Sequence, residues 1–186
     1  MDLPPLIEAK WQHFFNIMDV NNDGLVEKRD FTELAEKIFI VYEANGQQIG
    51  MKVLLKKADR LFNRLIFEMH LSHKNEIELI DWFRWMQLNA KMGEESPAYK
   101  RLTYNIFKEL FNVCDQNGDG FLSRQELTDL YEIFGIETSE ASLAFSFIDG
   151  NNDGKISRSE FLEGIREFFI DNEKNQTVFG HISPKY

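Results

Sequence analysis

The sequence predicts an all-α protein of four helix–loop–helix units in two pairs, packed into one compact globule, with short two-stranded β-bridges between paired loops. Three observations carry this expectation. An acidic twelve-residue pattern recurs along the chain, helical periodicity flanks each copy, and that periodicity breaks at 93–97. The 186 residues are 43% hydrophobic and include 17 Phe, so the chain can bury a sizeable core.

The recurring pattern reads "DVNNDGLVEKRD" at 19–30, "DQNGDGFLSRQE" at 115–126 and "DGNNDGKISRSE" at 149–160. Each copy has Asp at position 1, Asn at 3, Asp at 5, Gly at 6 and an aliphatic residue at 8. This is the signature of an EF-hand calcium loop. One such cluster would be read as a solvated turn. Three such clusters in one register, each followed by an apolar helix, indicate metal-binding loops.

The spacing of oxygen-bearing residues in these loops suits calcium. Calcium takes six to eight oxygens at about 2.3–2.6 Å. Positions 1, 3 and 5 supply side-chain oxygens, position 7 a carbonyl, position 9 a direct or water-mediated contact, and position 12 a carboxylate. The candidate ligands are therefore Asp19, Asn21, Asp23, Leu25 (carbonyl), Glu27, Asp30, Asp115, Asn117, Asp119, Phe121 (carbonyl), Ser123, Glu126, Asp149, Asn151, Asp153, Lys155 (carbonyl), Ser157 and Glu160.

The first loop departs from the pattern at its last position. Asp30 stands where the other two copies have Glu, and its side chain is one methylene shorter. Bidentate contact is then harder, and six-fold coordination suits magnesium better than seven-fold coordination does. Glu27 at position 9 offers partial compensation because it is long enough to reach the ion directly. We expect three Ca²⁺ sites, with Mg²⁺ competing mainly at the first loop.

A fourth unit is expected between the first and second copies, because EF-hands work in pairs. The best register is "HLSHKNEIELID" at 70–81, which keeps Ile77 at position 8 and Asp81 at position 12. We interpret it as a degenerate hand that kept its fold and lost its ion; a plain helical linker is the alternative. Positions 1, 3 and 5 need oxygen ligands that are mostly anionic, but they hold His70, Ser72 and Lys74, and Lys74 would put a cation beside the metal.

The four units are called hands 1 to 4 in chain order. The sequence predicts an N-terminal pair over 1–92 with hand 1 active and hand 2 degenerate, a C-terminal pair over 98–170 with both hands active, and a tail over 171–186 that packs on the globule. Position-8 residues should face each other across each bridge, Val26 with Ile77 and Leu122 with Ile156. The predicted helices cover 5–18, 28–44, 51–69, 79–92, 98–114, 124–134, 140–148 and 158–170.

With these motifs in place, the whole chain resembles the sarcoplasmic calcium-binding protein group, which includes calexcitin, calerythrin and the coelenterazine-binding and aequorin-type proteins. The resemblance rests on uneven hand spacing, a silent second hand and the tail "NQTVFGHISPKY" with its Phe-Gly pair. It implies a compact globule with the tail laid across a shared aromatic core. The candidates for that core are Phe14, Phe15, Phe31, Phe62, Trp82, Phe83, Phe107, Phe111, Phe145, Phe168 and Phe169.

Composition narrows the functional classes. The formal net charge of −10 disfavours nucleic acid, because phosphate binding needs clustered Lys and Arg. No run approaches the ~18 apolar residues of a membrane span, and the start of the chain lacks a secretory-signal pattern. We therefore expect a cytoplasmic monomer. No catalytic motif occurs, so no enzyme is expected, and the single cysteine, Cys114, is read as a small buried residue.

Three functions remain open on the sequence. The first is a calcium buffer or modulator of calcium signals, and the second is a sensor that regulates a protein partner. The third, motivated by the resemblance alone, is a carrier that releases a hydrophobic ligand such as a luciferin when calcium binds. The last helix lacks the His and Trp that light-emitting relatives place there. Residues that would line a pocket, or else be merely packed or exposed, are Trp11, His13, Trp82, Trp85 and His181.

Overall fold

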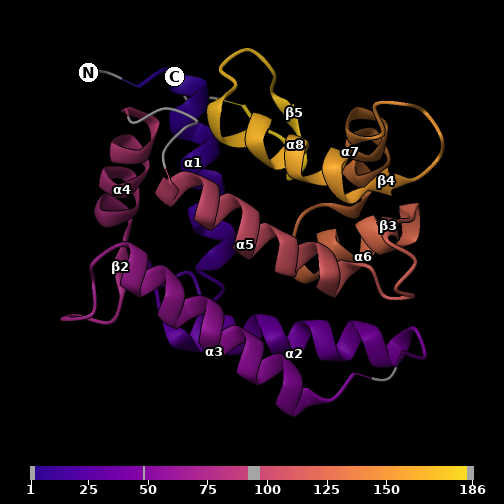
Figure 1. Ribbon diagram of the computed structural model, residues 1–186, viewed down its shortest axis with the longest axis horizontal. Helices are drawn as coiled ribbons and strands as arrows, with labels where there is room; N and C mark the ends of the chain where they lie inside the picture. Colours follow the sequence, from indigo (N-terminus) through magenta and orange to yellow (C-terminus); the bar gives the residue numbers. More distant parts are fainter. Residues whose placement is uncertain (1–2, 48, 92–96, 184–186) are drawn as a thin grey trace. The chain divides into compact units, whose positions relative to one another are not determined.

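The computed structural model describes residues 3–47, 49–91 and 97–183, with side chains except at 89–91 and 97–105. Its elements are helical apart from two-residue strands (Figure 1). In chain order they are α1 (Pro5–Met18), β1 (Leu25–Val26), α2 (Lys28–Ala44), α3 (Met51–Glu68), β2 (Ile77–Glu78), α4 (Leu79–Lys91), α5 (Pro97–Cys114), β3 (Phe121–Leu122), α6 (Arg124–Phe134), a 3₁₀ turn (Thr138–Glu140), α7 (Ala141–Ile148), β4 (Ile156–Ser157), α8 (Arg158–Ile170), β5 (Gln176–Thr177) and β6 (Gly180–His181).

The predicted all-α class is confirmed, and four helices (α1, α2, α6 and α8) begin and end at the predicted residues. Helix α3 ends one residue earlier, at Glu68, and α5 begins one residue earlier, at Pro97. The 3₁₀ turn takes up the predicted start of α7. The boundary proposed at 93–97 lies outside the described residues, except for Pro97. In the described ranges no helix is long and apolar enough to cross a membrane.

Contacts divide the chain into two units within helix α1. One unit joins the residues up to His13 to those from Arg101 onward, and the other runs Phe14–Lys100. The predicted domains 1–92, 98–170 and 171–186 remain sequence-based predictions, as does the packing of the two pairs into one globule.

The unit Phe14–Lys100 is built around helices α2 and α3, which lie side by side (Figure 1). Their apolar stripes meet because residues at three- and four-residue spacing share one helix face. Trp82 on α4 stacks with Phe14 and Trp85 at ring-centroid distances of 5.8 and 5.9 Å. The buried centre of the α2–α3 contact is Ala35, Leu54 and Ala58, covered by Phe31, Ile38, Phe39 and Ile49.

In the other unit the C-terminal tail forms a hairpin that contributes to the core. Strands β5 and β6 pair Thr177 with Gly180, so Val178 and Phe179 form the two-residue turn. Gly180 has φ 91°, a left-handed conformation that costs glycine least. The fully buried Phe179 ring lies against three other rings, those of Phe107 (6.4 Å), Phe134 (6.1 Å) and Phe168 (5.0 Å).

The first half of α1 is bonded to this C-terminal segment. The buried Lys10 donates from Nζ to the Asp171 carbonyl at 2.6 Å, and Trp11 Nε1 donates to the Phe169 carbonyl at 3.1 Å. The His13 Nε2 lies 3.0 Å from the Phe179 carbonyl. These long-range bonds explain why the residues up to His13 belong with the C-terminal unit.

Most of the predicted aromatic core is buried. Phe31 and Phe83 are only partly buried, although Phe31 lies 5.6 Å from Phe62 between ring centroids. The buried members are Phe14, Phe15, Phe62, Trp82, Phe107, Phe111, Phe145, Phe168 and Phe169.

Candidate metal sites

Two short bridges pair the four loops. In β1–β2 Val26 faces Ile77, and in β3–β4 Leu122 faces Ile156. All four side chains are fully buried, with 0% exposure. The pairing predicted from position 8 is therefore confirmed, including that of the degenerate hand. Each bridge fixes the chain next to position 7, whose carbonyl is a predicted ligand.

Position 6 gives each loop its sharp turn. Gly24, Gly120 and Gly154 have φ of 87°, 85° and 83°, in the left-handed region where a side chain would be strained. In hand 2 Asn75 takes the same position at φ 58°. Asn tolerates this conformation better than most residues with a side chain, so hand 2 keeps the turn without a glycine.

The carboxylate at position 1 organises the loop in hands 1, 3 and 4. Asp19 accepts a hydrogen bond from Asp23 N at Oδ1 (3.2 Å) and one from Gly24 N at Oδ2 (2.9 Å). Asp19 and Asp149 are each 5% exposed, so they lie in the loop interior. The same pair of bonds recurs as Asp119 N and Gly120 N to Asp115, and as Asp153 N and Gly154 N to Asp149.

The carboxylate at position 12 closes the two C-terminal loops. Glu126 Oε1 accepts from Gln116 N (2.9 Å) and Asn117 N (3.4 Å), and its Oε2 accepts from Ser123 N (2.8 Å). Ser123 is also the N-cap of α6, in a reciprocal capping box with Glu126. Sequence reasoning treated position 9 only as a ligand and missed this role, although Ser-x-x-Glu before an apolar run is its signal. Hand 4 repeats it with Ser157 and Glu160 on α8.

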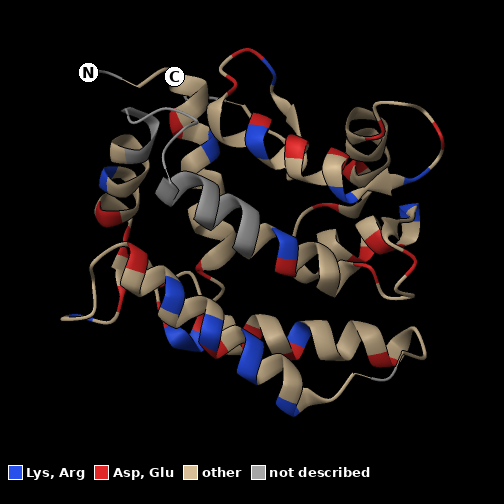
Figure 2. Ribbon diagram, viewed as in Figure 1, with Lys and Arg blue, Asp and Glu red and all other residues tan. Residues whose placement is uncertain are grey.

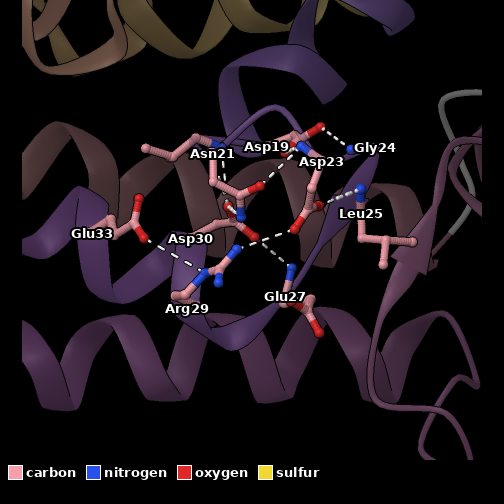
Figure 3. A network of polar contacts seen from close by, with 10 residues as sticks. Asp19, Asn21, Asp23, Gly24, Leu25, Glu27, Arg29, Asp30 and Glu33 are labelled. Carbon is pink, nitrogen blue, oxygen red and sulfur yellow. Dashed lines mark hydrogen bonds and ion pairs between the residues drawn. The ribbon is translucent and has the colours of Figure 1, made fainter.

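In hand 1 the shorter Asp30 makes the corresponding bonds (Figure 3). Its Oδ1 accepts from Val20 N (3.1 Å) and Asn21 N (3.4 Å), and its Oδ2 accepts from Glu27 N (2.7 Å). Asp30 is fully buried. It therefore reaches the same backbone positions as Glu126, so hand 1 closes around a carboxylate that is one methylene shorter.

Hand 1 differs from hands 3 and 4 in the hydrogen-bond partners of its position-3 side-chain amide and its position-5 carboxylate. Arg29 Nη2 donates to Asp23 Oδ2 at 3.1 Å, and Arg29 Nε lies 3.6 Å from Glu33 Oε1 (Figure 3). The Asn21 amide donates to Asp30 Oδ1 at 3.0 Å. Nothing in the loop pattern singled out Arg29. In hands 3 and 4 the position-3 amide donates instead to position 5, as Asn117 to Asp119 and Asn151 to Asp153.

In hand 2 a lysine contacts the position-12 carboxylate. Lys74 Nζ lies 2.6 Å from Asp81 Oδ2 and 3.2 Å from Glu78 Oε1. Asp81 Oδ2 also accepts from Glu78 N at 3.1 Å, which is the closing bond of the other hands. The first half of this loop is rebuilt as a turn, because Lys74 N and Asn75 N both donate to the Leu71 carbonyl.

The pair in hand 2 is electrostatically matched. The hydrogen bond to Asp81 raises the pKa of Lys74, since it favours the charged ammonium. Burial alone would raise the pKa of Asp81, but the bonds from Lys74 and Glu78 N outweigh it and the pKa lies below its ordinary value. Both groups are therefore charged at neutral pH.

The loops of hands 1, 3 and 4 offer the donors that a hard cation prefers, since each brings together carboxylate, amide and carbonyl oxygens. In the described residues no three His, Cys, Asp or Glu side chains gather into a ready-made metal cluster. The position-1 and position-12 carboxylates accept bonds from loop N–H groups instead. Several buried carboxylates in one loop repel each other, and a bound cation compensates their negative charge. The residues present fit a calcium ion.

The aromatic and histidine candidates for a pocket divide between the two units. Trp11 and His13 are bonded to the C-terminal segment, and Trp82 and Trp85 stack on each other in the unit Phe14–Lys100. His181 is exposed. Cys114 is buried as predicted, and burial raises the pKa of its thiol, so it is not an activated nucleophile.

Family models agree with this geometry. Residues 106–166 match the model of an EF-hand domain pair, and residues 12–35 match that of an EF hand. These two stretches of the chain therefore carry EF-hand sequence. The match over 106–166 takes in the loops of hands 3 and 4, and the match over 12–35 takes in the loop of hand 1.

Curated relatives of this chain are distant. It is 22% identical over 133 residues to calcium-binding protein CML42 of Arabidopsis thaliana, covering 72% of this chain and 67% of the relative. It is 26% identical over 135 residues to calcium-binding protein CAST of Solanum tuberosum, covering 72% and 63%. The matches therefore span about two thirds of each relative's length.

Solved structures share the fold of this chain over nearly its whole length. A sarcoplasmic calcium-binding protein from amphioxus has a TM-score of 0.75 at 13% identity, covering 96% of this chain and 98% of its own. The calcium-loaded apo coelenterazine-binding protein of Renilla muelleri has a TM-score of 0.68 at 18% identity, covering 96% of each chain. The predicted resemblance to the sarcoplasmic group is thus confirmed at the level of the fold.

Proposed function

We propose that this protein binds metal at three EF-hands, in loops 19–30, 115–126 and 149–160, and serves as an intracellular calcium buffer or modulator of calcium signals. One observation carries the proposal. The same hydrogen-bond frame links position 1 to positions 5 and 6 in all three loops. Hand 2 instead has Lys74 at position 5, in contact with its own carboxylates.

The bound ions would be held by the eighteen predicted ligands, six in each loop. A calcium ion there draws the carboxylate and carbonyl oxygens of one loop onto a single centre. Three divalent ions would offset six of the ten net negative charges of the chain. Asp and Glu residues occur along the loop between α5 and α6 (Figure 2). Neutralising them relieves repulsion, so metal binding should stabilise the folded state by mass action.

The first site is the one where we expect Mg²⁺ to compete. The side chain of Asp30 is one methylene shorter than that of Glu126, so it is less able to bind the ion through both oxygens. Magnesium prefers the smaller, six-coordinate shell. A solved neighbour of similar fold, the photoprotein berovin, is described as binding magnesium in all three of its calcium loops. It has a TM-score of 0.65 at 19% identity and covers 87% of each chain.

Calorimetric titration with Ca²⁺ and with Mg²⁺ tests the three sites. In a Glu126→Gln/Glu160→Gln variant, hands 3 and 4 lose a charged ligand each, and one site should remain, in hand 1. A Glu132→Gln/Glu163→Gln variant is the control, because both residues are exposed on the same helices, α6 and α8. If the first variant binds neither ion, the site assigned to hand 1 is wrong.

A second candidate function is a calcium-triggered carrier of a small hydrophobic ligand. The fold shared with the coelenterazine-binding protein favours it. A coelenterazine titration that shifts the ligand's absorbance, and reverses on adding Ca²⁺, would support the carrier over the buffer. The sensor alternative predicts that Ca²⁺ markedly increases the binding of a hydrophobic dye, whereas a buffer predicts little change.

A further inference from the structure

The ion pairs of Lys74 in hand 2 involve loop positions that hold the metal in an active EF-hand. Lys74 stands at position 5, where hands 1, 3 and 4 carry a ligand aspartate. Its ammonium contacts the carboxylates of positions 9 and 12, Glu78 and Asp81, at 3.2 and 2.6 Å. A calcium ion in an active loop is also held by positions 5, 9 and 12. The lysine thus brings a positive charge to the oxygens that would otherwise face the metal.

The second half of hand 2 has the geometry of the metal-binding hands despite its missing ligands. Asp81 accepts the bond from the position-9 N–H at 3.1 Å, and Ile77 is fully buried in the bridge. The equivalent closing bonds in the other hands are Glu27 N to Asp30 (2.7 Å), Ser123 N to Glu126 (2.8 Å) and Ser157 N to Glu160 (2.8 Å).

We propose that Lys74 is a tethered substitute for the metal ion of hand 2, which holds that loop in its paired form at every calcium concentration and so preorganises hand 1. The inference rests on the proposed function, since it assumes that hand 1 binds an ion. Because the ammonium is attached to the loop, its effective concentration at the carboxylates is high and independent of free calcium.

A short chain of contacts links Lys74 to the metal ligands of hand 1. Lys74 contacts Glu78, and Glu78 pairs directly with Leu25 in the β1–β2 bridge. Leu25 is position 7 of hand 1, whose carbonyl is a predicted ligand. Without a cation, Glu78 and Asp81 would repel each other beside this bridge. Fixing their geometry therefore fixes the carbonyl before the ion arrives, which lowers the ordering cost of binding.

The test uses the Glu126→Gln/Glu160→Gln protein, in which hand 1 is the site under study. Adding Lys74→Met keeps the chain length and apolar stem but removes the charge. We expect the Ca²⁺ affinity of hand 1 to fall by about fivefold, the scale of a partly exposed ion-pair network. Lys56→Met is the matched control, since Lys56 is exposed on α3, the helix before this loop, where Lys and Arg recur (Figure 2). An unchanged affinity in Lys74→Met would overturn the proposal.

Two further variants separate charge from folding. Lys74→Arg retains the cation and should keep the affinity within about twofold of the parent. The variant that combines Lys74→Met with Asp81→Asn should bind Ca²⁺ at hand 1 no more weakly than the weaker-binding of the two single variants, because the partners act as one unit. Strictly additive losses would show that Lys74 does not act through Asp81.

Amide hydrogen exchange in the metal-free protein supplies a readout that does not depend on metal binding. The β1–β2 bridge should be protected without calcium, and Lys74→Met should remove that protection while Lys56→Met leaves it. If the parent fails to bind Ca²⁺ at hand 1 while Lys74→Met still loses this protection, the proposed function of hand 1 fails and the role of Lys74 stands. Equal protection in both variants would contradict the role of Lys74.

Discussion

Asp30 and Glu126 differ by one methylene, yet they accept hydrogen bonds from the same loop positions. Hand 1 therefore makes the closing bonds of hand 3 with a carboxylate that is one methylene shorter. Since Asp30 is fully buried, its distance from the loop is set by helix α2 and by the bonds from Val20 and Asn21. The shorter reach of Asp30 is the physical basis for expecting a smaller ion to compete at hand 1.

Replacing Asp30 with Glu should make hand 1 more selective for calcium. The added methylene lets both carboxylate oxygens reach the ion, which favours seven-fold coordination, and we expect the ratio of Ca²⁺ to Mg²⁺ affinity to rise by about tenfold. Calorimetry in the Glu126→Gln/Glu160→Gln background measures it. Glu36→Asp, an exposed change of the same size on α2, is the control. A ratio that stays constant would remove the role given to side-chain length.

Arg29 should weaken hand 1 by competing with the ion for Asp23. The pair is 3.1 Å apart and exposed, with side-chain exposures of 58% and 39%, so the effect is modest. Arg29→Gln gives position 11 the residue of hand 3, Gln125, and should raise the Ca²⁺ affinity by about two- to fivefold at low salt. The gain should shrink at high salt, as screening predicts.

Lys28→Gln is the comparison for Arg29→Gln, because Lys28 pairs with Asp59 outside the loop. It removes the same charge from the neighbouring position on α2. An equal gain from both variants would mean that general electrostatics, and not the contact with Asp23, sets the affinity.

At the scale of elements, the tail hairpin stabilises the C-terminal unit through one ring. Phe179 is fully buried among Phe107, Phe134 and Phe168. Phe179→Ala should lower the free energy of unfolding by about 3 kcal/mol, because it leaves a cavity as well as losing apolar burial. Urea denaturation measures the loss. Leu143→Ala, at a side chain on α7 that is 64% exposed, should change it by less than about 0.5 kcal/mol. Similar losses in both would contradict this account of the tail.

Helix α1 carries a pH-dependent contact with the same tail. Burial lowers the pKa of His13, while the bond to the Phe179 carbonyl and the charge of Glu140 partly offset that effect. The folded state therefore binds the imidazole proton less readily than the unfolded state does, and stability is lost as pH falls below the ordinary value of 6.5.

Metal-free protein should accordingly lose free energy of unfolding between about pH 7.5 and 5.5, the range in which histidine titrates. His13→Gln keeps an N–H donor for the Phe179 carbonyl and should show a shallower slope over that range. Urea denaturation at several pH values compares the two. Parallel curves would mean that another group carries the pH dependence.

The helices and loop pairing were predictable from sequence because they rest on local periodicity and on the fixed twelve-residue spacing. Val26 and Ile77 could be paired in advance, since both stand at position 8. The contacts that cross long stretches of sequence were not predictable. Lys10 and His13 bond to the C-terminal segment, and the side chains give no local signal of such partners. The buried role of Phe179 also depends on packing that no periodicity records.

Within the candidate sites the same limit applies. The ligand positions followed from the pattern, but the pairing of Arg29 with Asp23 depends on side-chain direction at the start of α2. Lys74 could be recognised as unsuitable for a ligand position. Its contacts with two carboxylates of its own loop could not be predicted, because they depend on the turn at Leu71. This turn replaces the first half of a normal EF-hand loop.

For the molecule as a whole, charge and metal content are linked. The chain has a net charge of −10, and each Ca²⁺ neutralises part of the repulsion among loop carboxylates. Binding at a free ion concentration of 100 times Kd would add about 2.7 kcal/mol of stability per site. The stability of hand 2 should not depend on the calcium concentration, because its positive charge is supplied by Lys74 of the chain itself.

The number of calcium ions bound tests the central claim most directly. Native mass spectrometry of the full chain at saturating Ca²⁺ should show three ions as the highest occupied state, falling to one in Glu126→Gln/Glu160→Gln. Four ions would show that hand 2 binds metal despite Lys74. Two or fewer in the unaltered chain would contradict the assignment of hands 1, 3 and 4.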